Sequence, residues 1–172
     1  MKQGDRSEAE YYANIIDPMD YLEKVVSPNV EELILSRDDF RLSVNAILSI
    51  DSFVGVIYRY NSSRDLNESC VSDDGFRSEL ARLDADYRIA RDLAAALKHG
   101  SLTRKCDPPR QVSKAEDLVE LLVGAGTLMC GYHPLGARCA FIQAGGAYQS
   151  PGLLCRRVEL FLRDNVLEKL HI

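Results

Sequence analysis

The sequence lacks several features on which an assignment of function usually rests. Acidic residues outnumber basic ones by 26 to 21, and the net charge of −5 argues against a broad nucleic-acid surface while leaving a local basic site open. Residues 1–10 are polar almost throughout and hold no secretory hydrophobic segment, and no apolar run approaches the length of a membrane span. We therefore expect a cytoplasmic protein without a membrane role.

Phosphate loops and metal motifs are missing as well. Gly145-Gly146 is the only adjacent glycine pair, and it fits no phosphate-binding spacing. His133 beside Cys130 lacks further ligands nearby and is interpreted as a turn histidine. No two of the five cysteines have the close spacing of a zinc knuckle, so we expect reduced, mostly buried thiols and predict neither metal nor cofactor. The cysteines are Cys70, Cys106, Cys130, Cys139 and Cys155.

The pattern of apolar residues predicts a mainly α fold. A length of 172 residues with 46% hydrophobic residues fits one domain over residues 1–172, in which residues 1–16 form a polar lead-in. Apolar positions recur at intervals of three and four in most segments, which predicts a bundle of about four main helices. A small β-hairpin is expected within 124–149, before the C-terminal helix, with Thr127–Tyr132 pairing with Ala137–Gln143.

Capping residues predict where the helices begin and end. Asp17-Pro18 and Ser150-Pro151 are typical helix starts, and Pro28 is expected to kink the first helix or to begin a second one. Other helices are expected over about 38–60, from residue 74 or 75 to Leu83, and over Ala85–His99, which Gly100 closes. The sequence Ser113-Lys114-Ala115-Glu116 has the form of a capping box and predicts a further helix up to Leu122.

The helix expected over Ala85–His99 carries the polar residues that best support a functional hypothesis. At about 100° per residue, Asp92 and His99 lie within about 20° of each other, and Arg88 shares their face. Arg91 lies at the edge of this stripe, above a floor of alanines. A histidine can act as general acid or base near neutral pH, and an arginine can hold a phosphate. The combination is chemically sufficient for metal-independent RNA cleavage.

A structural explanation of the same residues stays open. Arg88 and Asp92, four residues apart, would form an ion pair along the helix. Lys98 and His99 lie in the last turn, where the helix dipole favours positive charge. The alanines would then serve only to let another helix approach closely.

Two other polar features complete the list of candidates. Asp51 lies near the apolar stripe of the longest helix and is interpreted as a buried anchor, with Arg88 or Arg91 as its expected partner. The three basic residues that follow the Ala85–His99 helix are interpreted as solvated surface. They are Arg104, Lys105 and Arg110.

The stretch Arg91-Asp92-Leu93-Ala94-Ala95-Ala96-Leu97-Lys98-His99 resembles a pattern of small uncharacterised bacterial helical proteins, Arg-Asp-(Ile/Leu)-Ala-Asn-Ala-x-Lys-His. The helices around Arg41 to Phe53 and around Val158 and Phe161 are similar to two further patterns of those proteins. Together the three cover most of the chain. These proteins resemble in turn the HEPN superfamily of helical domains, many of which are ribonucleases of toxin–antitoxin and anti-phage defence systems.

The resemblance implies a homodimer in which two Arg-x(4–6)-His motifs build one RNA-cleaving site. Arg91 and His99 would be the cleaving residues, with Asp92 as the polar residue that often follows the arginine and Arg88 as the alternative arginine. Seven residues separate Arg91 from His99, one more than usual, and Ala95 replaces the asparagine of the pattern. Either difference fits a non-catalytic member that acts as a binding or dimerisation module.

Three hypotheses follow from these observations. The first is a non-enzymatic interaction protein, a dimer or a subunit of a bacterial or phage-related assembly, with Ala90–Ala96 or the last helix as its interface. The second is a metal-independent HEPN-type ribonuclease, with RNA as its ligand. The third, without a specific motif, is a small-molecule site near Tyr132 and Tyr148. The nuclease hypothesis requires His99 and an arginine to converge on a solvent-accessible cleft.

Overall fold

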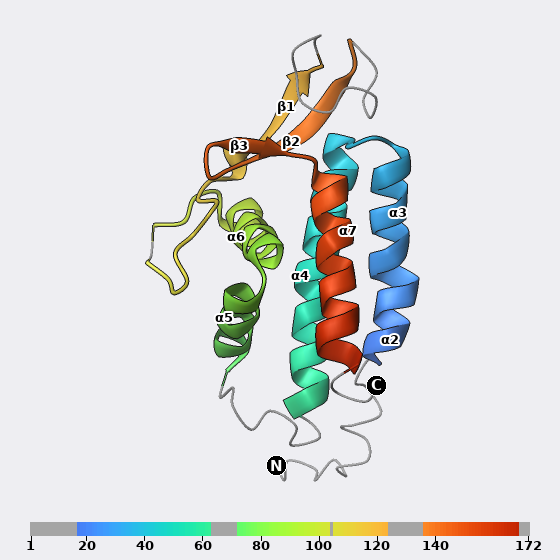
Figure 1. Cartoon of the computed structure of the whole chain (residues 1–172), viewed down its shortest axis with the longest axis vertical. Coiled ribbons are helices and arrows are strands. Elements are labelled where there is room, and N and C mark those ends of the chain that lie inside the picture. Colours follow the sequence, from blue (N-terminus) through green and yellow to red (C-terminus); the bar gives the residue numbers. More distant parts are fainter. Residues whose placement is uncertain (1–16, 63–71, 104, 124–135, 169–172) are drawn as a thin grey trace, which may run out of the picture.

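A computed structural model describes residues 17–62, 72–103, 105–123 and 136–168. It is mainly helical, with a small antiparallel sheet before the C-terminal helix, and thereby confirms the predicted fold class (Figure 1). The helical elements are α2 (Pro18–Tyr21), η1 (Leu22–Val26), α3 (Ser27–Leu35), α4 (Phe40–Ser62), α5 (Asp73–Leu83), α6 (Ala85–His99), η2 (Ala115–Asp117), α7 (Pro151–Leu162) and η3 (Arg163–Leu167). The strands are β1 (Leu118–Leu122), β2 (Arg138–Ala144) and β3 (Ala147–Gln149).

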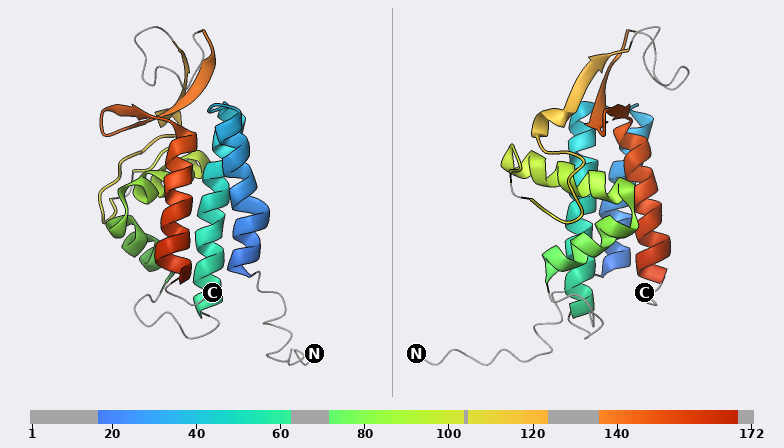
Figure 2. Two further views of the ribbon diagram at one scale, coloured as in Figure 1. Left: turned by 45° about the vertical axis from the view of Figure 1, so that its right-hand side comes forward. Right: turned by 60° about the vertical axis from the view of Figure 1, so that its left-hand side comes forward.

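The helices form a bundle around α4. The helices α3, α4 and α7 run side by side, and α5 and α6 lie on the other side of α4 and α7 from α3 (Figures 1 and 2). The sheet has the order β1-β2-β3. Figure 2 shows the paired strands β1 and β2 extending beyond one end of the helices.

Side-chain caps start α2, α6 and α7 where the sequence predicted them. The Asp17 carboxylate accepts the backbone N–H of Met19 at 2.8 Å, and the Asp84 carboxylate accepts that of Tyr87 at 2.6 Å. At its other end α6 stops at Gly100, whose φ of 78° is a conformation that glycine adopts without strain. The bounds of α6 are therefore set by residues inside and next to the helix itself.

The helical path continues through Pro28 by way of a widened turn. The π-helical segment η1 directly precedes the α3 helix, in which Pro28 occupies the first turn. Proline has no N–H to donate, and its ring crowds the carbonyl one turn earlier. A widened turn relieves this crowding without ending the helix.

The prediction of a helix over 113–122 is wrong. A single 3-10 turn, η2, is followed at once by β1. The Asp117 carboxylate accepts the backbone N–H groups of Ser113 and Lys114 at 2.9 and 3.0 Å, which closes a turn at the point where a longer helix would begin. Leucine and valine are compatible with either conformation, and pairing with β2 decides for a strand.

The hairpin therefore has a different first strand from the one predicted. β1 pairs with β2 from Leu118↔Ile142 to Leu122↔Arg138, so the second predicted strand, Ala137–Gln143, is nearly correct. The other predicted strand, Thr127–Tyr132, lies outside the described residues. Leu118 is the buried residue of β1, and it joins the main core together with Ala140 and Ile142 of β2.

The α4 helix is the centre of that core. With 23 residues and a window of mean hydropathy 1.5, it has the length and composition of a membrane span, contrary to the sequence-based expectation. In the bundle 56% of that window is buried. Its apolar residues are explained by their contacts with the surrounding helices, since they include the fully buried Ile47, Phe53 and Ile57.

The alanines of α6 serve the packing of the chain itself. Ala90, Ala94 and Ala96 are exposed by 1%, 0% and 0%, and α6 packs against α4 and α7. These three alanines are thus covered within one chain, whereas Ala95 is half-buried and lines the pocket described below. Small side chains here allow the close approach of neighbouring helices.

A buried carboxylate joins the sheet to the bundle. Asp38, in the turn between α3 and α4, has a φ of 64° and is 0% exposed. Its backbone carbonyl accepts the N–H of Ala140 in β2 at 2.7 Å, and its side chain accepts that of Gly152 in α7 at 2.6 Å. A Cβ atom at Gly152 would lie 2.8 Å from this carboxylate, so the contact requires glycine.

Candidate functional site

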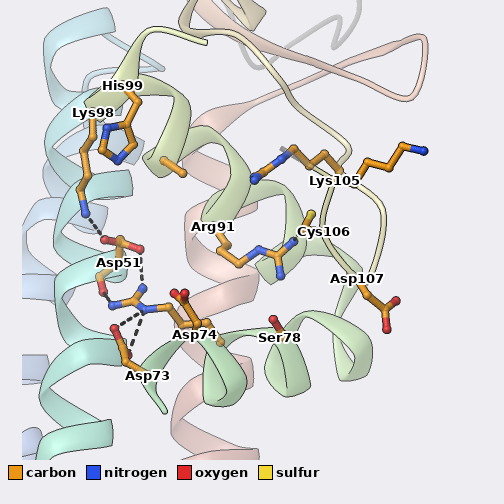
Figure 3. A pocket seen from close by; sticks show the side chains of 13 residues that line it. Asp51, Asp73, Asp74, Ser78, Arg91, Lys98, His99, Lys105, Cys106 and Asp107 are labelled. Carbon is orange, nitrogen blue, oxygen red and sulfur yellow. Dashed lines mark hydrogen bonds and ion pairs between the residues drawn. The ribbon is translucent and has the colours of Figure 1, made fainter. Parts of the chain in front are cut away.

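A pocket of about 570 Å³ opens between α5, α6 and the connector that follows α6. Charged side chains from several parts of the chain line it (Figure 3). These lining residues are Asp51, Asp73, Asp74, Arg77, Ser78, Arg91, Ala95, Lys98, His99, Lys105, Cys106, Asp107 and Arg110.

Arg91 and His99 both line this pocket. His99 is exposed in the last turn of α6, and the Arg91 side chain retains 11% exposure. Figure 3 shows both residues projecting from α6 along the same hollow. A histidine and an arginine of a single chain therefore line the same solvent-accessible pocket.

Arg88 and Asp92 are not among the lining residues, so the pocket includes only part of the predicted polar stripe. Asp92 is 0% exposed, because the connector after α6 covers it. Arg88 donates from Nε to the carbonyl of Ala81 in α5 at 3.0 Å. It therefore does not form the predicted pair with Asp92, and it ties α6 to α5 instead.

Asp92 organises the pocket wall from behind. Its carboxylate accepts hydrogen bonds from Nη2 and Nε of Arg91 at 2.8 and 3.1 Å and from the backbone N–H of Gln111 at 2.8 Å. Nη1 of Arg110 lies 3.6 Å away. A buried carboxylate is stable only with such partners. Asp92 consequently fixes two arginines and the connector, and it touches the pocket only through them.

The opposite wall is an ion-pair network around Asp51. Asp51 pairs with Arg77 of α5 and with Lys98 of α6, and Nε of Arg77 also lies 3.0 Å from Asp73. The prediction of Arg88 or Arg91 as the partner of Asp51 is therefore wrong. Burial by itself lowers the pKa of Arg77, but Asp51 and Asp73 outweigh it, and the pKa is raised. Arg77 therefore stays positively charged at neutral pH.

The connector supplies residues whose role the sequence did not reveal. Lys105 is exposed at the pocket rim, and Arg110 lies beside Asp92, so both belong to the pocket wall rather than to unrelated surface. Cys106 lies 3.9 Å from Nη2 of Arg91 and 3.2 Å from the carbonyl of Pro108. Arg104 lies outside the described residues. The clustering of basic residues just after α6 was the sequence feature that could have indicated their place in the pocket.

One side of the pocket is acidic and the other is basic, and ion pairs neutralise part of the charge on each. Asp92 pairs with Arg91 and Arg110 from behind the basic side, and the exposed Asp74 also lines the acidic side. The carboxylates of Asp51 and Asp73 are engaged by Arg77 and Lys98, and Asp107 pairs with Arg82 at 2.8 Å. The other side carries the groups that suit a phosphate, namely guanidinium and ammonium groups next to an imidazole. They belong to Arg91, His99, Lys105 and Arg110.

The structure adds little support to the other predicted sites. The described residues contain no group of three or more metal-ligating side chains, and Cys130, His133 and Tyr132 lie outside them. Tyr148 packs edge-on against Phe141, with 6.4 Å between ring centroids. Cys139 and Cys155 are buried free thiols, and burial raises the pKa of both.

Comparisons with known proteins add no relative to this description. No protein-family model, no curated protein and no solved structure matches the chain.

Proposed function

We propose that this chain is a cytoplasmic, HEPN-like interaction module that binds RNA through the phosphate backbone in the pocket beside α6. The observation that carries this proposal is that Arg91, His99, Lys105 and Arg110 line one solvent-accessible hollow. Phosphate contacts supply most of the sequence-independent affinity for nucleic acid, and planar guanidinium groups suit phosphate oxygens. The net charge of −5 makes a local site more plausible than a broad one.

Binding is better supported than cleavage in a single chain. Metal-independent RNA cleavage needs a base that takes the proton of the 2′-hydroxyl and an acid that protonates the leaving 5′-oxygen. His99 is the one histidine of the described residues, so one pocket offers one imidazole. Asp92, which the resemblance includes in the site, is buried and serves to position arginines.

Anisotropy measurements on a labelled single-stranded RNA test the binding proposal. Lys105→Glu should weaken binding about tenfold, because it reverses a charge at the pocket rim. Lys24→Glu is the matched control, since Lys24 is exposed and pairs with Asp20, away from the pocket. It should change the affinity less than about twofold. Absence of RNA binding, or equal effects of the two substitutions, would contradict the proposal.

A second candidate is the ribonuclease itself, formed as a homodimer in a toxin–antitoxin or defence system. It is favoured by the presence of Arg91 and His99 at the same pocket, because a second copy would add a second imidazole. Wild type, His99→Ala and His99→Gln, matched by circular dichroism, should be incubated with RNA in a metal chelator. Cleavage by wild type alone would support the nuclease. If all three proteins bind RNA without cleaving it, the result would contradict the nuclease and support the interaction module.

A further inference from the structure

His99 lies at the boundary between two hollows. Besides the pocket described above, it lines a second hollow of about 540 Å³ at the C-terminal end of α6. The residues that line this second hollow are His99, Gly100, Ser101, Lys114 and Glu116. Since His99 belongs to both sets, the two hollows are neighbours.

The second hollow is built by tied backbone segments. Ser101 and Lys114 form an antiparallel bridge, Ala115 donates to the carbonyl of Gly100 at 2.8 Å, and Leu102 donates to that of Ser113 at 2.8 Å. A Cβ atom added to Gly100 would meet no other atom within 4 Å, so this part of the backbone faces open space. The hollow therefore has a defined floor that a ligand can approach closely.

The chemistry of the second hollow suits a continuation of the same ligand. Lys114 and Ser101 are both exposed and offer an ammonium and a hydroxyl group, while Glu116 adds a carboxylate that repels a phosphate and accepts hydrogen bonds from sugar or base. Each hollow therefore has an exposed lysine in its lining, Lys105 in the first and Lys114 in the second. Proteins that bind single-stranded nucleic acid without sequence preference use positively charged groups that follow the backbone.

We propose that the ligand of this site is an extended single strand of RNA that crosses His99 and occupies both hollows. This inference rests on the proposed RNA binding. One strand segment contacts Arg91, Arg110 and Lys105, and the next contacts Lys114. A mononucleotide or dinucleotide fills one hollow and gains nothing from Lys114.

Competition experiments with unlabelled oligouridylates of two, four, eight and twelve nucleotides test this path. For wild type the affinity should rise at least about tenfold between the two-mer and the eight-mer. Lys114→Ala should weaken the twelve-mer about fivefold, lower its salt slope by about 0.7, and leave the two-mer unchanged. Lys105→Ala should weaken all lengths. Lys24→Ala is the matched control, and urea unfolding verifies that each variant is folded.

Glu116→Gln provides a second variant that removes charge without removing contacts. It should strengthen binding of the twelve-mer about twofold and leave the two-mer unchanged, because only the longer strand reaches this carboxylate. An eight-mer that binds no better than a two-mer, or a Lys114→Ala effect of equal size at every length, would overturn the path while leaving RNA binding intact. Tighter binding of a polyglutamate than of the twelve-mer would also overturn it. Failure of every oligonucleotide to bind would contradict both proposals.

Discussion

Asp38 and Asp92 are both fully buried carboxylates, yet they belong to regions with different tasks. Asp38 joins the α3–α4 turn to β2 and α7, and its side chain accepts the backbone N–H of Gly152 at 2.6 Å. Asp92 joins α6 to the connector, and its side chain is engaged by Arg91 as well as by the N–H of Gln111.

The two carboxylates differ in what their hydrogen-bond donors connect them to. The Gly152 N–H that Asp38 accepts lies in the first turn of α7, so this carboxylate meets the positive end of that helix dipole. At Asp92 the donors include arginines that extend to a pocket. The same buried group thus stabilises the fold in one region and shapes a candidate site in the other.

The largest effect is expected from Asp38→Ala. It removes a charged acceptor from the buried Gly152 N–H and places alanine at a φ of 64°, so the free energy of unfolding should fall by about 3 kcal/mol. Urea denaturation measures the loss. The RNA affinity of the folded fraction should stay unchanged, and an altered affinity would contradict the separation of the two regions.

Gly152→Ala should have the next largest effect on stability. Its methyl group would lie 2.8 Å from Oδ1 of Asp38 and 3.3 Å from Cγ1 of Ile34. This crowding should cost about 2 kcal/mol despite the better helix propensity of alanine. Thermal unfolding checks it, with Gly136→Ala as a control that meets open space but a positive φ. A stabilised Gly152→Ala variant would show that the Asp38 contact is loose.

Asp92→Asn should act on the site more than on the fold. It keeps an acceptor for Gln111 N–H and removes the charge, so the stability loss should be about 1.5 kcal/mol. Ordering two arginines on binding should cost about 1 kcal/mol each. Removing a negative charge about 8 Å from a phosphate in water returns only about 0.5 kcal/mol. The RNA affinity should therefore fall about tenfold, which corresponds to the remaining cost of about 1.5 kcal/mol. Anisotropy and urea titration of one sample measure both, and an unchanged or higher affinity would refute the positioning role.

The smallest effect is expected from Tyr87→Phe. Burial raises the pKa of Tyr87, and its hydroxyl has no hydrogen-bond partner among the described residues. Its removal should therefore stabilise the protein by about 0.5 kcal/mol at neutral pH. Above about pH 10 the unfolded tyrosine ionises while the native one does not, so wild type loses up to about 1.4 kcal/mol per pH unit through this group. Urea midpoints from about pH 9 to 11 should decline less steeply in the variant. Equal slopes would contradict the raised pKa.

Much of the fold could be predicted because its signals are local. Asp84 and Gly100 bound α6 through contacts within a few residues, and the prediction of Ala85–His99 is confirmed. The strand Leu118–Leu122 could not be distinguished from a helix, because its hydrophobic pattern fits both and its pairing with β2 is a long-range choice. For the pocket, the sequence identified Arg91 and His99, whereas Lys105 and Arg110 join them only when the connector folds back.

The sequence by itself determined the helix bounds at Asp17, Asp84 and Gly100, since a cap needs only its own neighbours to satisfy backbone groups. The tertiary structure decided which polar side of α6 meets solvent. Asp92 and His99 lie close in angle along the helix, but the N–H of Gln111, 19 residues later, covers Asp92 and leaves His99 exposed. Burial depends on which distant segment supplies hydrogen-bond partners, and helical periodicity carries no information about that segment.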